Sequence, residues 1–134
     1  MSEPFRILIA EDEPIVALDL GETVISLGYQ LAGYATTATD VLARAKDQSP
    51  DLVLMDIRLG LSDGVYAARH IREHFGLPVV FVSAFTTDLD RRGVAGLGLV
   101  VPKPFTTEML RRAIENTVAA VSQSQLRSRI WSQP

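Results

Sequence analysis

The chain has 134 residues, of which 47% are hydrophobic and 22% charged, and its formal net charge is −3. This composition indicates one globular domain, and the slight negative charge argues against nucleic acid as the main partner. The absence of cysteine excludes disulfides, thiol catalysis and thiolate metal sites. The sequence contains no apolar stretch of roughly 20 residues that would span a bilayer and no secretory signal, so we expect a cytoplasmic protein without membrane contact.

Short apolar runs alternate with amphipathic segments along the chain. The apolar runs predict strands at residues 5–10, 30–35, 51–55, 78–82 and 99–101. Helical spacing of apolar residues predicts helices at residues 14–27, 37–47, 65–75 and 87–94, and from residue 106 or 107 onward. Residues 59–64 are predicted to form a loop. This alternation indicates an α/β fold, a flavodoxin-like doubly wound sheet of five parallel strands in the order 2-1-3-4-5.

Several residues mark the expected ends of the helices. Pro14 suits the first turn of a helix, and Thr37 with Asp40 resembles a capping box. Gly28 and Gly76 are typical of the position just after a helix. These signals place the helix boundaries independently of the apolar pattern.

Polar residues follow four of the predicted strands. Glu11 and Asp12 follow the first strand, Asp56 the third, Ser83 the fourth and Lys103 the fifth. Ligand sites in parallel sheets form at the carboxyl ends of the strands, so we expect these side chains to surround one point. Each residue alone has an ordinary explanation as a cap, turn or surface residue. Their joint position at successive strand ends favours a functional site.

The three carboxylates indicate a site for a hard cation, because they repel one another unless a cation lies among them. Mg²⁺ binds oxygen ligands and commonly uses one or two carboxylates together with water and phosphate oxygens. We expect Asp12 and Asp56 to be direct ligands and Glu11 to hold a metal-bound water. The backbone carbonyl of Arg58 is expected to complete the shell.

The same site is suited to phosphoryl transfer. A carboxylate can act as a nucleophile and form an acyl phosphate. Lys103 supplies a compact positive charge for the phosphoryl oxygens, and Ser83 supplies a hydroxyl donor. His70 and His74, four residues apart on one predicted helix, have the spacing of metal ligands but no third ligand nearby. A solvated helix face is therefore the favoured interpretation of the two histidines.

Motifs around these residues resemble a known family. They are Ile7-Leu8-Ile9-Ala10-Glu11-Asp12-Glu13, Leu54-Met55-Asp56-Ile57-Arg58-Leu59, Asp63-Gly64, Val82-Ser83-Ala84 and Lys103-Pro104-Phe105. In this order and at these separations, they resemble the receiver domain of two-component response regulators, the fold of the chemotaxis regulator. The resemblance covers roughly residues 6–121.

The resemblance implies a role for each matching residue. Asp56 would be the phospho-accepting aspartate, and Glu11 and Asp12 the acidic pair that binds Mg²⁺, for which Mn²⁺ can substitute. Ser83 would contact the phosphoryl group and move on activation, and Lys103 would bind the phosphate. The bond between Lys103 and Pro104 is expected to be cis, as is usual in the family.

The sequence departs from the family pattern at two positions. Val100 stands where the family usually has an aromatic switch residue, three positions before the lysine, and Gly60 stands where many relatives have proline. Arg58 and Phe85 occupy positions that tune the lifetime of the phosphoryl group. We expect Ala84, next to Ser83, to belong to these switch and tuning positions as well.

The resemblance also implies an organisation and a set of partners. Residues 1–121 would form the receiver domain, and residues 122–134 an extension of the last helix and a tail. The phosphoryl donor would be a histidine kinase or phosphotransfer protein, and output would pass through an unidentified protein rather than by direct DNA binding. A homodimer through the last helix, or through the face formed by the fourth helix, fifth strand and fifth helix, is kept as an alternative.

Three other interpretations remain open. A Mg²⁺-dependent phosphatase or phosphotransferase with an aspartyl intermediate would use similar residues, but such enzymes place two aspartates two positions apart after the first strand. A binding module that has lost phosphorylation is disfavoured by the presence of Asp56, Ser83 and Lys103. The chain could also be a receiver domain excised from a longer regulator. Among these interpretations, the resemblance favours a signalling switch that catalyses only its own phosphorylation and dephosphorylation.

Overall fold

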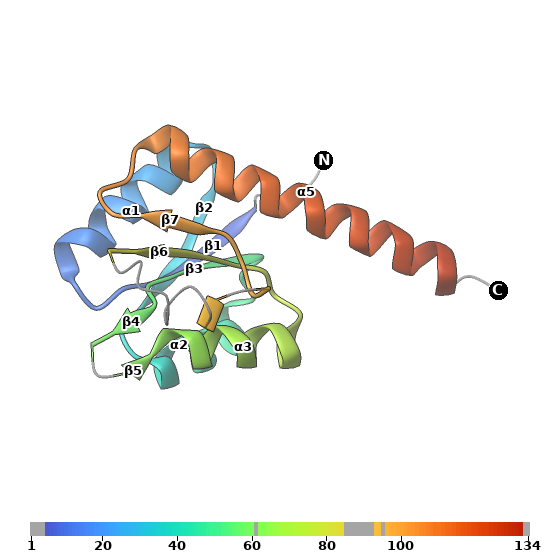
Figure 1. Ribbon diagram of the computed structural model, residues 1–134, viewed down its shortest axis with the longest axis horizontal. Coiled ribbons are helices and arrows are strands. Elements are labelled where there is room, and N and C mark those ends of the chain that lie inside the picture. Colours follow the sequence, from blue (N-terminus) through green and yellow to red (C-terminus); the bar gives the residue numbers. More distant parts are fainter. Residues whose placement is uncertain (1–4, 61, 85–92, 95, 133–134) are drawn as a thin grey trace.

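The computed structural model describes residues 5–60, 62–84, 93–94 and 96–132, and it describes no side chain at residue 62 or beyond residue 121. Its centre is a parallel sheet of five strands (Figure 1). The strands are β1 (Arg6–Ala10), β2 (Gln30–Ala35), β3 (Leu52–Met55), β6 (Val79–Ser83) and β7 (Val100–Pro102). They lie in the order β2-β1-β3-β6-β7. Counted along the chain, this is the predicted order 2-1-3-4-5.

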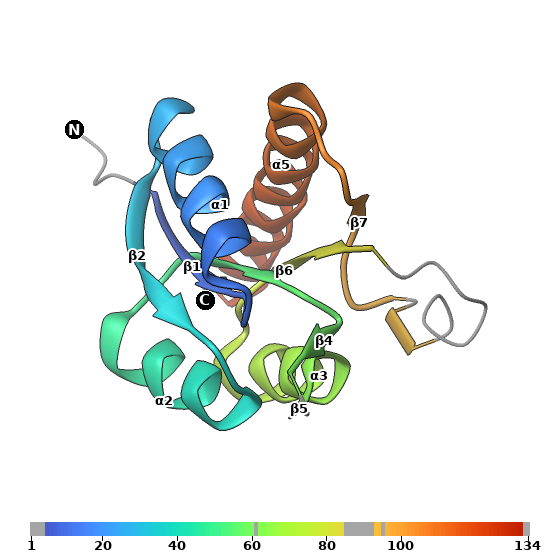
Figure 2. The same ribbon diagram turned by 90° about the vertical axis from the view of Figure 1, so that its left-hand side faces the viewer.

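Two layers of helices cover the sheet (Figure 2). One face carries α1 (Pro14–Ser26) and α5 (Thr107–Ser132), and the other carries α2 (Ala38–Gln48) and α3 (Gly64–Phe75). Side chains of β1 alternate between the two cores, since Ile7 and Ile9 pack towards α1 and α5 while Leu8 and Ala10 pack towards α2 and α3. Strands buried on both faces explain why the sequence shows continuous apolar runs there.

Local capping explains where two of the helices begin. The Thr37 side chain accepts a hydrogen bond from the Asp40 backbone N–H, as predicted, while the Asp40 carboxylate accepts from the Thr36 N–H. The Asp63 carboxylate caps α3 by accepting from the backbone N–H groups of Val65 and Tyr66. The sequence analysis missed this second cap.

The predicted loop at residues 59–64 was wrong. Two short strands, β4 (Arg58–Leu59) and β5 (Ser62–Asp63), pair antiparallel in this segment. Leu59 is fully buried, so tertiary packing stabilises strands too short to be recognised from sequence. The fifth sheet strand is shifted by one residue from its predicted position, because Phe81 pairs with Val100 and Ser83 with Pro102. The helix predicted at residues 87–94 lies, except for residues 93 and 94, outside the described residues.

Helix α5 is anchored to the sheet over its first half. Leu110, Ala113 and Ile114 are buried against the core, and the helix then continues past the sheet to Ser132 (Figure 1). Its division at residue 121 into a receiver domain and an extension stays a prediction. Within the described part of the chain, no helix combines the length and hydropathy needed to cross a membrane.

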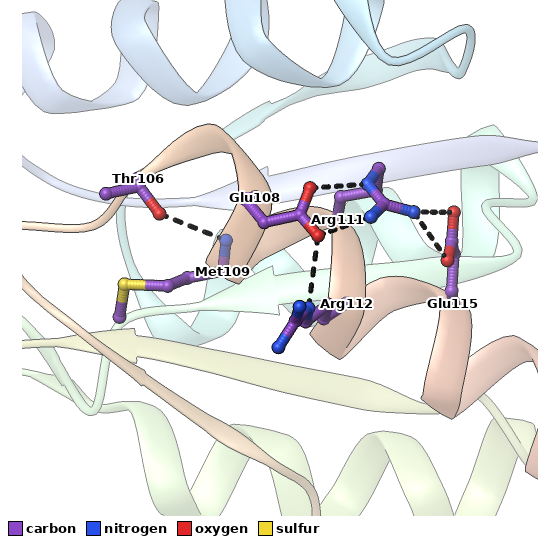
Figure 3. A network of polar contacts seen from close by, with 6 residues as sticks. All are labelled: Thr106, Glu108, Met109, Arg111, Arg112 and Glu115. Atoms are coloured by element: carbon purple, nitrogen blue, oxygen red, sulfur yellow. Dashed lines mark hydrogen bonds and ion pairs between the residues drawn. The ribbon is translucent and has the colours of Figure 1, made fainter.

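The exposed start of α5 carries a network of charged side chains (Figure 3). Glu108 forms ion pairs with Arg111 and Arg112, and Arg111 also pairs with Glu115. The helix begins with the hydroxyl of Thr106, which accepts a hydrogen bond from the Met109 backbone N–H. These contacts are local, since every pair is three or four residues apart on one helix.

Candidate functional site

Backbone hydrogen bonds align the site residues at one edge of the sheet. The N–H of Glu11 donates to the Ala35 carbonyl, and the N–H of Asp56 donates to the Ala10 carbonyl, both at 3.0 Å. The N–H of Lys103 donates to the Ser83 carbonyl, also at 3.0 Å. Each residue therefore continues the ladder one position beyond its strand, and the four strand ends meet as predicted.

Three carboxylates lie together at this edge. Oxygen atoms of Glu11, Asp12 and Asp56 all lie within 4.8 Å of one another. Glu11 is 1% exposed and Asp56 8% exposed, while Asp12 faces solvent. Two buried carboxylates and one exposed carboxylate form an all-oxygen donor set that is open on one side. This set fits a hard divalent cation that keeps several waters, as Mg²⁺ does.

Lys103 connects the two buried carboxylates. Its Nζ lies 2.8 Å from Glu11 Oε2 and 3.1 Å from Asp56 Oδ2. The lysine follows β7, the edge strand of the sheet, whereas the carboxylates follow β1 and β3. One ammonium cannot balance three carboxylates, so the cluster keeps an excess of negative charge that would attract a cation.

A backbone N–H group holds the second oxygen of each buried carboxylate. Glu11 Oε1 accepts from the Glu13 N–H, and Asp56 Oδ1 accepts from the Arg58 N–H, each at 3.2 Å. The two carboxylates therefore share one arrangement, with one oxygen bound to Lys103 and the other to the backbone two residues along. Charge-assisted hydrogen bonds on both oxygens fix the orientation of each group.

Burial and charge shift the pKa values within this cluster. Burial raises the pKa of Glu11 above its ordinary value of 4.5, and the charge of Asp56 raises it further, against the opposing effect of the hydrogen bond from Lys103. Burial lowers the pKa of Lys103, but the hydrogen bond to Glu11 and the charge of Asp56 outweigh it and leave that pKa above 10.5. Lys103 is therefore charged at neutral pH, and Glu11 holds a proton more readily than an ordinary carboxyl group.

Two glycines lie beside the acidic residues, one at a close backbone approach and one with a positive φ. A Cβ atom at Gly64 would lie 2.0 Å from the Asp56 carbonyl oxygen and 2.8 Å from that of Ile57, so only glycine permits α3 to begin this close to the backbone that follows β3. Gly60 has a φ of +59°, and a Cβ atom there would lie 3.5 Å from Asp12 Oδ2. The sequence analysis quoted Asp63-Gly64 as a motif without recognising this packing role.

The remaining predicted site residues lie around the cluster. Ser83 is fully buried at the end of β6, and Ala84 after it is exposed. Val100 is 39% exposed on β7, and Arg58 is exposed on β4. Phe85 lies outside the described residues. The individual roles expected for these residues stay predictions, as does the Arg58 carbonyl as a metal ligand.

A family model of the response regulator receiver domain matches residues 7–115, and the Lys103–Pro104 peptide bond is cis, as expected. The chain belongs to this family. Receiver domains are signalling switches of two-component systems that bind Mg²⁺ at an acidic pocket, and Glu11, Asp12 and Asp56 form an acidic group of this kind.

Several curated relatives and solved structures are similar to this receiver domain. The transcriptional regulatory protein PdtaR of Mycobacterium tuberculosis is 37% identical over 118 residues, which cover 87% of this chain and 58% of PdtaR. The phyllosphere-induced regulator PhyR of Methylorubrum extorquens is 40% identical over 82 residues, covering 60% of this chain and 31% of PhyR. The chain thus spans about half the length, or less, of curated relatives that it matches.

The structural neighbours include isolated and multidomain receivers. The signal receiver domain of a modulated diguanylate cyclase from Desulfovibrio desulfuricans has a TM-score of 0.84 and 26% identity, and the match covers 91% of this chain and 99% of that one. The response regulator PhyR from Brucella abortus has a TM-score of 0.82 and 32% identity, covering 94% of this chain and 52% of PhyR. These neighbours support the flavodoxin-like receiver fold.

Proposed function

We propose that this receiver domain accepts a phosphoryl group on Asp56 from the phosphohistidine of a histidine kinase or phosphotransfer protein. The observation that carries the proposal is the contact of Lys103 Nζ with both Glu11 and Asp56, beside an exposed Asp12. An acceptor carboxylate, a cation-binding pair and a phosphate-binding ammonium then occupy one edge of the sheet. This is the set of groups that phosphoryl transfer requires.

In the proposed step, an oxygen of the Asp56 carboxylate attacks phosphorus in line with the leaving imidazole. A P–O bond forms while the P–N bond breaks, and the electron pair of that bond remains on the imidazole nitrogen of the donor. Asp12, Asp56 and the Arg58 carbonyl would hold Mg²⁺ directly and Glu11 through a bound water, and the ion would supply charge neutralisation for the phosphoryl oxygens. Lys103 adds three N–H donors for the same oxygens.

The conformational response would begin at the ends of β6 and β7. A phosphoryl group on Asp56 offers new acceptors to the Lys103 ammonium and to the Ser83 hydroxyl. The backbone of these two residues is already joined by the hydrogen bond from Lys103 N–H to the Ser83 carbonyl. Movement of either side chain would therefore change the positions of both β6 and β7. The domain would then shift its population between two conformations that differ on the side of α5. At the position where the family usually has an aromatic switch residue, this chain would use the smaller aliphatic side chain of Val100.

Exposed apolar side chains beside the site support a protein as the donor. Ile15 is 84% exposed and Leu18 is 57% exposed at the start of α1, directly after the acidic pair. An apolar patch next to a phosphorylation site suits a helical partner that brings its phosphohistidine to Asp56. We place this reaction in the cytoplasm.

The output is proposed to be a contact with another protein. One solved relative, from Bartonella quintana, is described as the anti-anti-sigma factor PhyR and is 28% identical to this chain over 96% of its length. A net charge of −3 makes direct DNA binding an unfavourable alternative. We keep residues 1–121 as the switching unit and residues 122–134 as an extension that could serve a homodimer or a partner.

Intact mass measurement after incubation with acetyl phosphate and Mg²⁺ tests the chemistry. We expect one phosphoryl adduct in the wild-type protein and in Asp47→Asn, which removes an exposed carboxylate on α2. We expect no adduct in Asp56→Asn or in the presence of a chelator. Transfer from a purified phosphorylated phosphotransfer protein would then test the donor class.

An adduct that survives Asp56→Asn would overturn the assignment of the acceptor. Absence of any adduct in the wild-type protein, under conditions that label another receiver domain, would favour a phosphorylation-independent binding module. Steady release of phosphate from small phosphate esters would instead favour a phosphatase.

A further inference from the structure

Two histidines form a close pair on the exposed side of α3. The ring centroids of His70 and His74 lie 4.1 Å apart, and their planes are inclined by 34°. Tyr66 continues the same side of the helix, with its ring centroid 6.4 Å from that of His70. His74 is exposed and His70 is half-buried, so solvent reaches the pair. None of these side chains takes part in the proposed phosphoryl transfer.

The separation of the two rings suits a shared transition metal ion. Zinc binds an imidazole nitrogen at about 2.0–2.1 Å, which places the ring centroid about 3.2 Å from the ion. With a similar distance to Cu²⁺ or Ni²⁺, two imidazoles at adjacent corners of the tetragonal ion would have centroids about 4.5 Å apart. The observed 4.1 Å is close to this value, and small rotations about the side-chain bonds would supply the difference.

The position of the pair on the helix also favours a cation. His74 belongs to the last turn of α3, which ends at Phe75 with Gly76 in the left-handed conformation. The carbonyl end of a helix carries partial negative charge, and cations are stabilised there. Glu73 is an exposed carboxylate three residues after His70, a spacing that makes the two side chains neighbours on the helix, whereas Arg69 and Arg72 lie one and two residues from His70 and face other sides.

We propose that His70 and His74 form an open two-imidazole site on α3 for a divalent cation of tetragonal geometry such as Cu²⁺ or Ni²⁺. The remaining coordination positions would be filled by water, since the group of Glu11, Asp12 and Asp56 is the one cluster of three ligating residues within the described part of the chain. Imidazole nitrogen prefers these cations, whereas the carboxylate cluster suits Mg²⁺.

The proposed site is separate from the phosphoryl site. Helix α3 begins at Gly64, beside Asp56, and a rise of about 1.5 Å per residue places His70 about 9 Å and His74 about 15 Å farther along the axis. The acidic cluster and the histidine pair therefore lie at opposite ends of one helix. Each can be occupied without the other, and either proposal can fail independently.

Calorimetric titration of the full chain with Ni²⁺ provides the first test. Excess Mg²⁺ would occupy the acidic cluster, so that Ni²⁺ binding reports on the histidine pair. The matched control is the double variant Arg72→His, His74→Arg, which preserves composition and charge but changes the histidine spacing from four residues to two. Histidines two apart lie on different sides of a helix and cannot share one ion. Circular dichroism would verify that the control remains folded.

We expect one strong Ni²⁺ equivalent in the wild-type protein and an affinity about 100-fold lower in the double variant, because chelation by two groups is lost. Electron paramagnetic resonance with Cu²⁺ should show two imidazole nitrogens in the wild-type protein and one in the double variant. Equal Ni²⁺ affinity of the two proteins would overturn the proposal. A Cu²⁺ spectrum with one nitrogen or with oxygen ligands alone in the wild-type protein would also overturn it.

Discussion

The molecule contains two clusters of oppositely charged side chains, one at the edge of the sheet and one on the surface of α5. In the first, Lys103 connects Glu11 and Asp56, which lie 92 and 47 residues away in the sequence. In the second, Glu108 pairs with Arg111 three residues away and with Arg112 four residues away. The first cluster is nearly sealed from solvent around its carboxylates, whereas the second is exposed throughout.

The same kind of ion pair has a different consequence in each place. A buried carboxylate that loses its partner cannot regain full hydration, so the sheet-edge cluster couples charge to stability and to ligand binding. Exposed pairs on a helix exchange readily with water and salt and contribute little. Charge burial, rather than the number of ion pairs, therefore distinguishes the cluster at the sheet edge from the exposed cluster on α5.

The largest effect is expected from Lys103→Met, which keeps the length of the side chain but removes its charge. Glu11 and Asp56 would be left without a cation, and the free energy of unfolding should fall by about 3 kcal/mol at neutral pH without Mg²⁺. Urea denaturation measures this change, and added Mg²⁺ should restore part of it. Lys46→Met, at an exposed lysine of α2, should change the free energy by about 0.5 kcal/mol or less. Equal effects of the two substitutions would show that burial does not make the charge of Lys103 more important for stability than an exposed charge.

Gly64→Ala should have the next largest effect. Its new Cβ atom would lie 2.0 Å from the Asp56 carbonyl oxygen, so the start of α3 must move away from Asp56. We expect a loss of about 2 kcal/mol in the free energy of unfolding, together with slower phosphoryl uptake. Gly93→Ala is the control, since its Cβ atom would meet nothing closer than 3.5 Å. A Gly64→Ala protein as stable as this control would show that the contact is unimportant.

The pH dependence of Mg²⁺ affinity should reflect Glu11. Because burial raises the pKa of this carboxyl, protons compete with the cation at pH values above 4.5, and affinity should fall as the pH is lowered towards that raised pKa. The stability of the metal-free protein should depend on pH in the opposite sense. The folded state holds the Glu11 proton more tightly than the unfolded state, so the contribution of Glu11 to stability decreases as the pH rises through its folded pKa.

Glu11→Gln isolates this contribution. Titration calorimetry across the acidic range should show weaker Mg²⁺ binding with a reduced pH dependence in the variant. The difference in unfolding free energy between the wild-type protein and Glu11→Gln should also change across the same range. An identical pH profile for both proteins would assign the dependence to another group.

The smallest effect is expected from Glu108→Gln on the surface of α5. Arg111 and Arg112 hold the pKa of the Glu108 carboxyl below its ordinary value, but all three side chains face solvent. We expect no resolvable shift in the denaturation midpoint, in low or in high salt. Phosphoryl uptake should remain at the wild-type rate. A midpoint shift comparable to that of Lys103→Met would show that exposure does not separate the two clusters.

Much of the fold follows from the sequence, because both faces of the sheet are covered. The predicted strand at residues 30–35 has the observed bounds, and the first strand differs by one residue. The order of the sheet is the one typical of the flavodoxin-like class, which the alternation of strands and helices indicates. The β4–β5 hairpin was missed because two-residue strands have no periodicity of their own and depend on the burial of Leu59.

The composition of the candidate site also follows from the sequence, but its internal contacts do not. Because the carboxyl ends of parallel strands lie at one edge of the sheet, the sequence predicted that Glu11, Asp56 and Lys103 lie together. That Lys103 contacts both carboxylates, and that backbone N–H groups hold the opposite oxygens, depends on side-chain reach and loop geometry. The clearance at Gly64 likewise depends on how closely α3 approaches the sheet.

The length of α5 means that a small tilt of the helix on the sheet displaces its far end by a larger distance. The helix runs from Thr107 to Ser132, about 39 Å at 1.5 Å per residue, and it is packed on the sheet near its start (Figure 1). If it moves as a rigid rod, a tilt of about 5° at the anchored end displaces the far end by about 3 Å. A displacement that is barely measurable beside Lys103 would therefore become large enough at residue 132 to change which surfaces meet there.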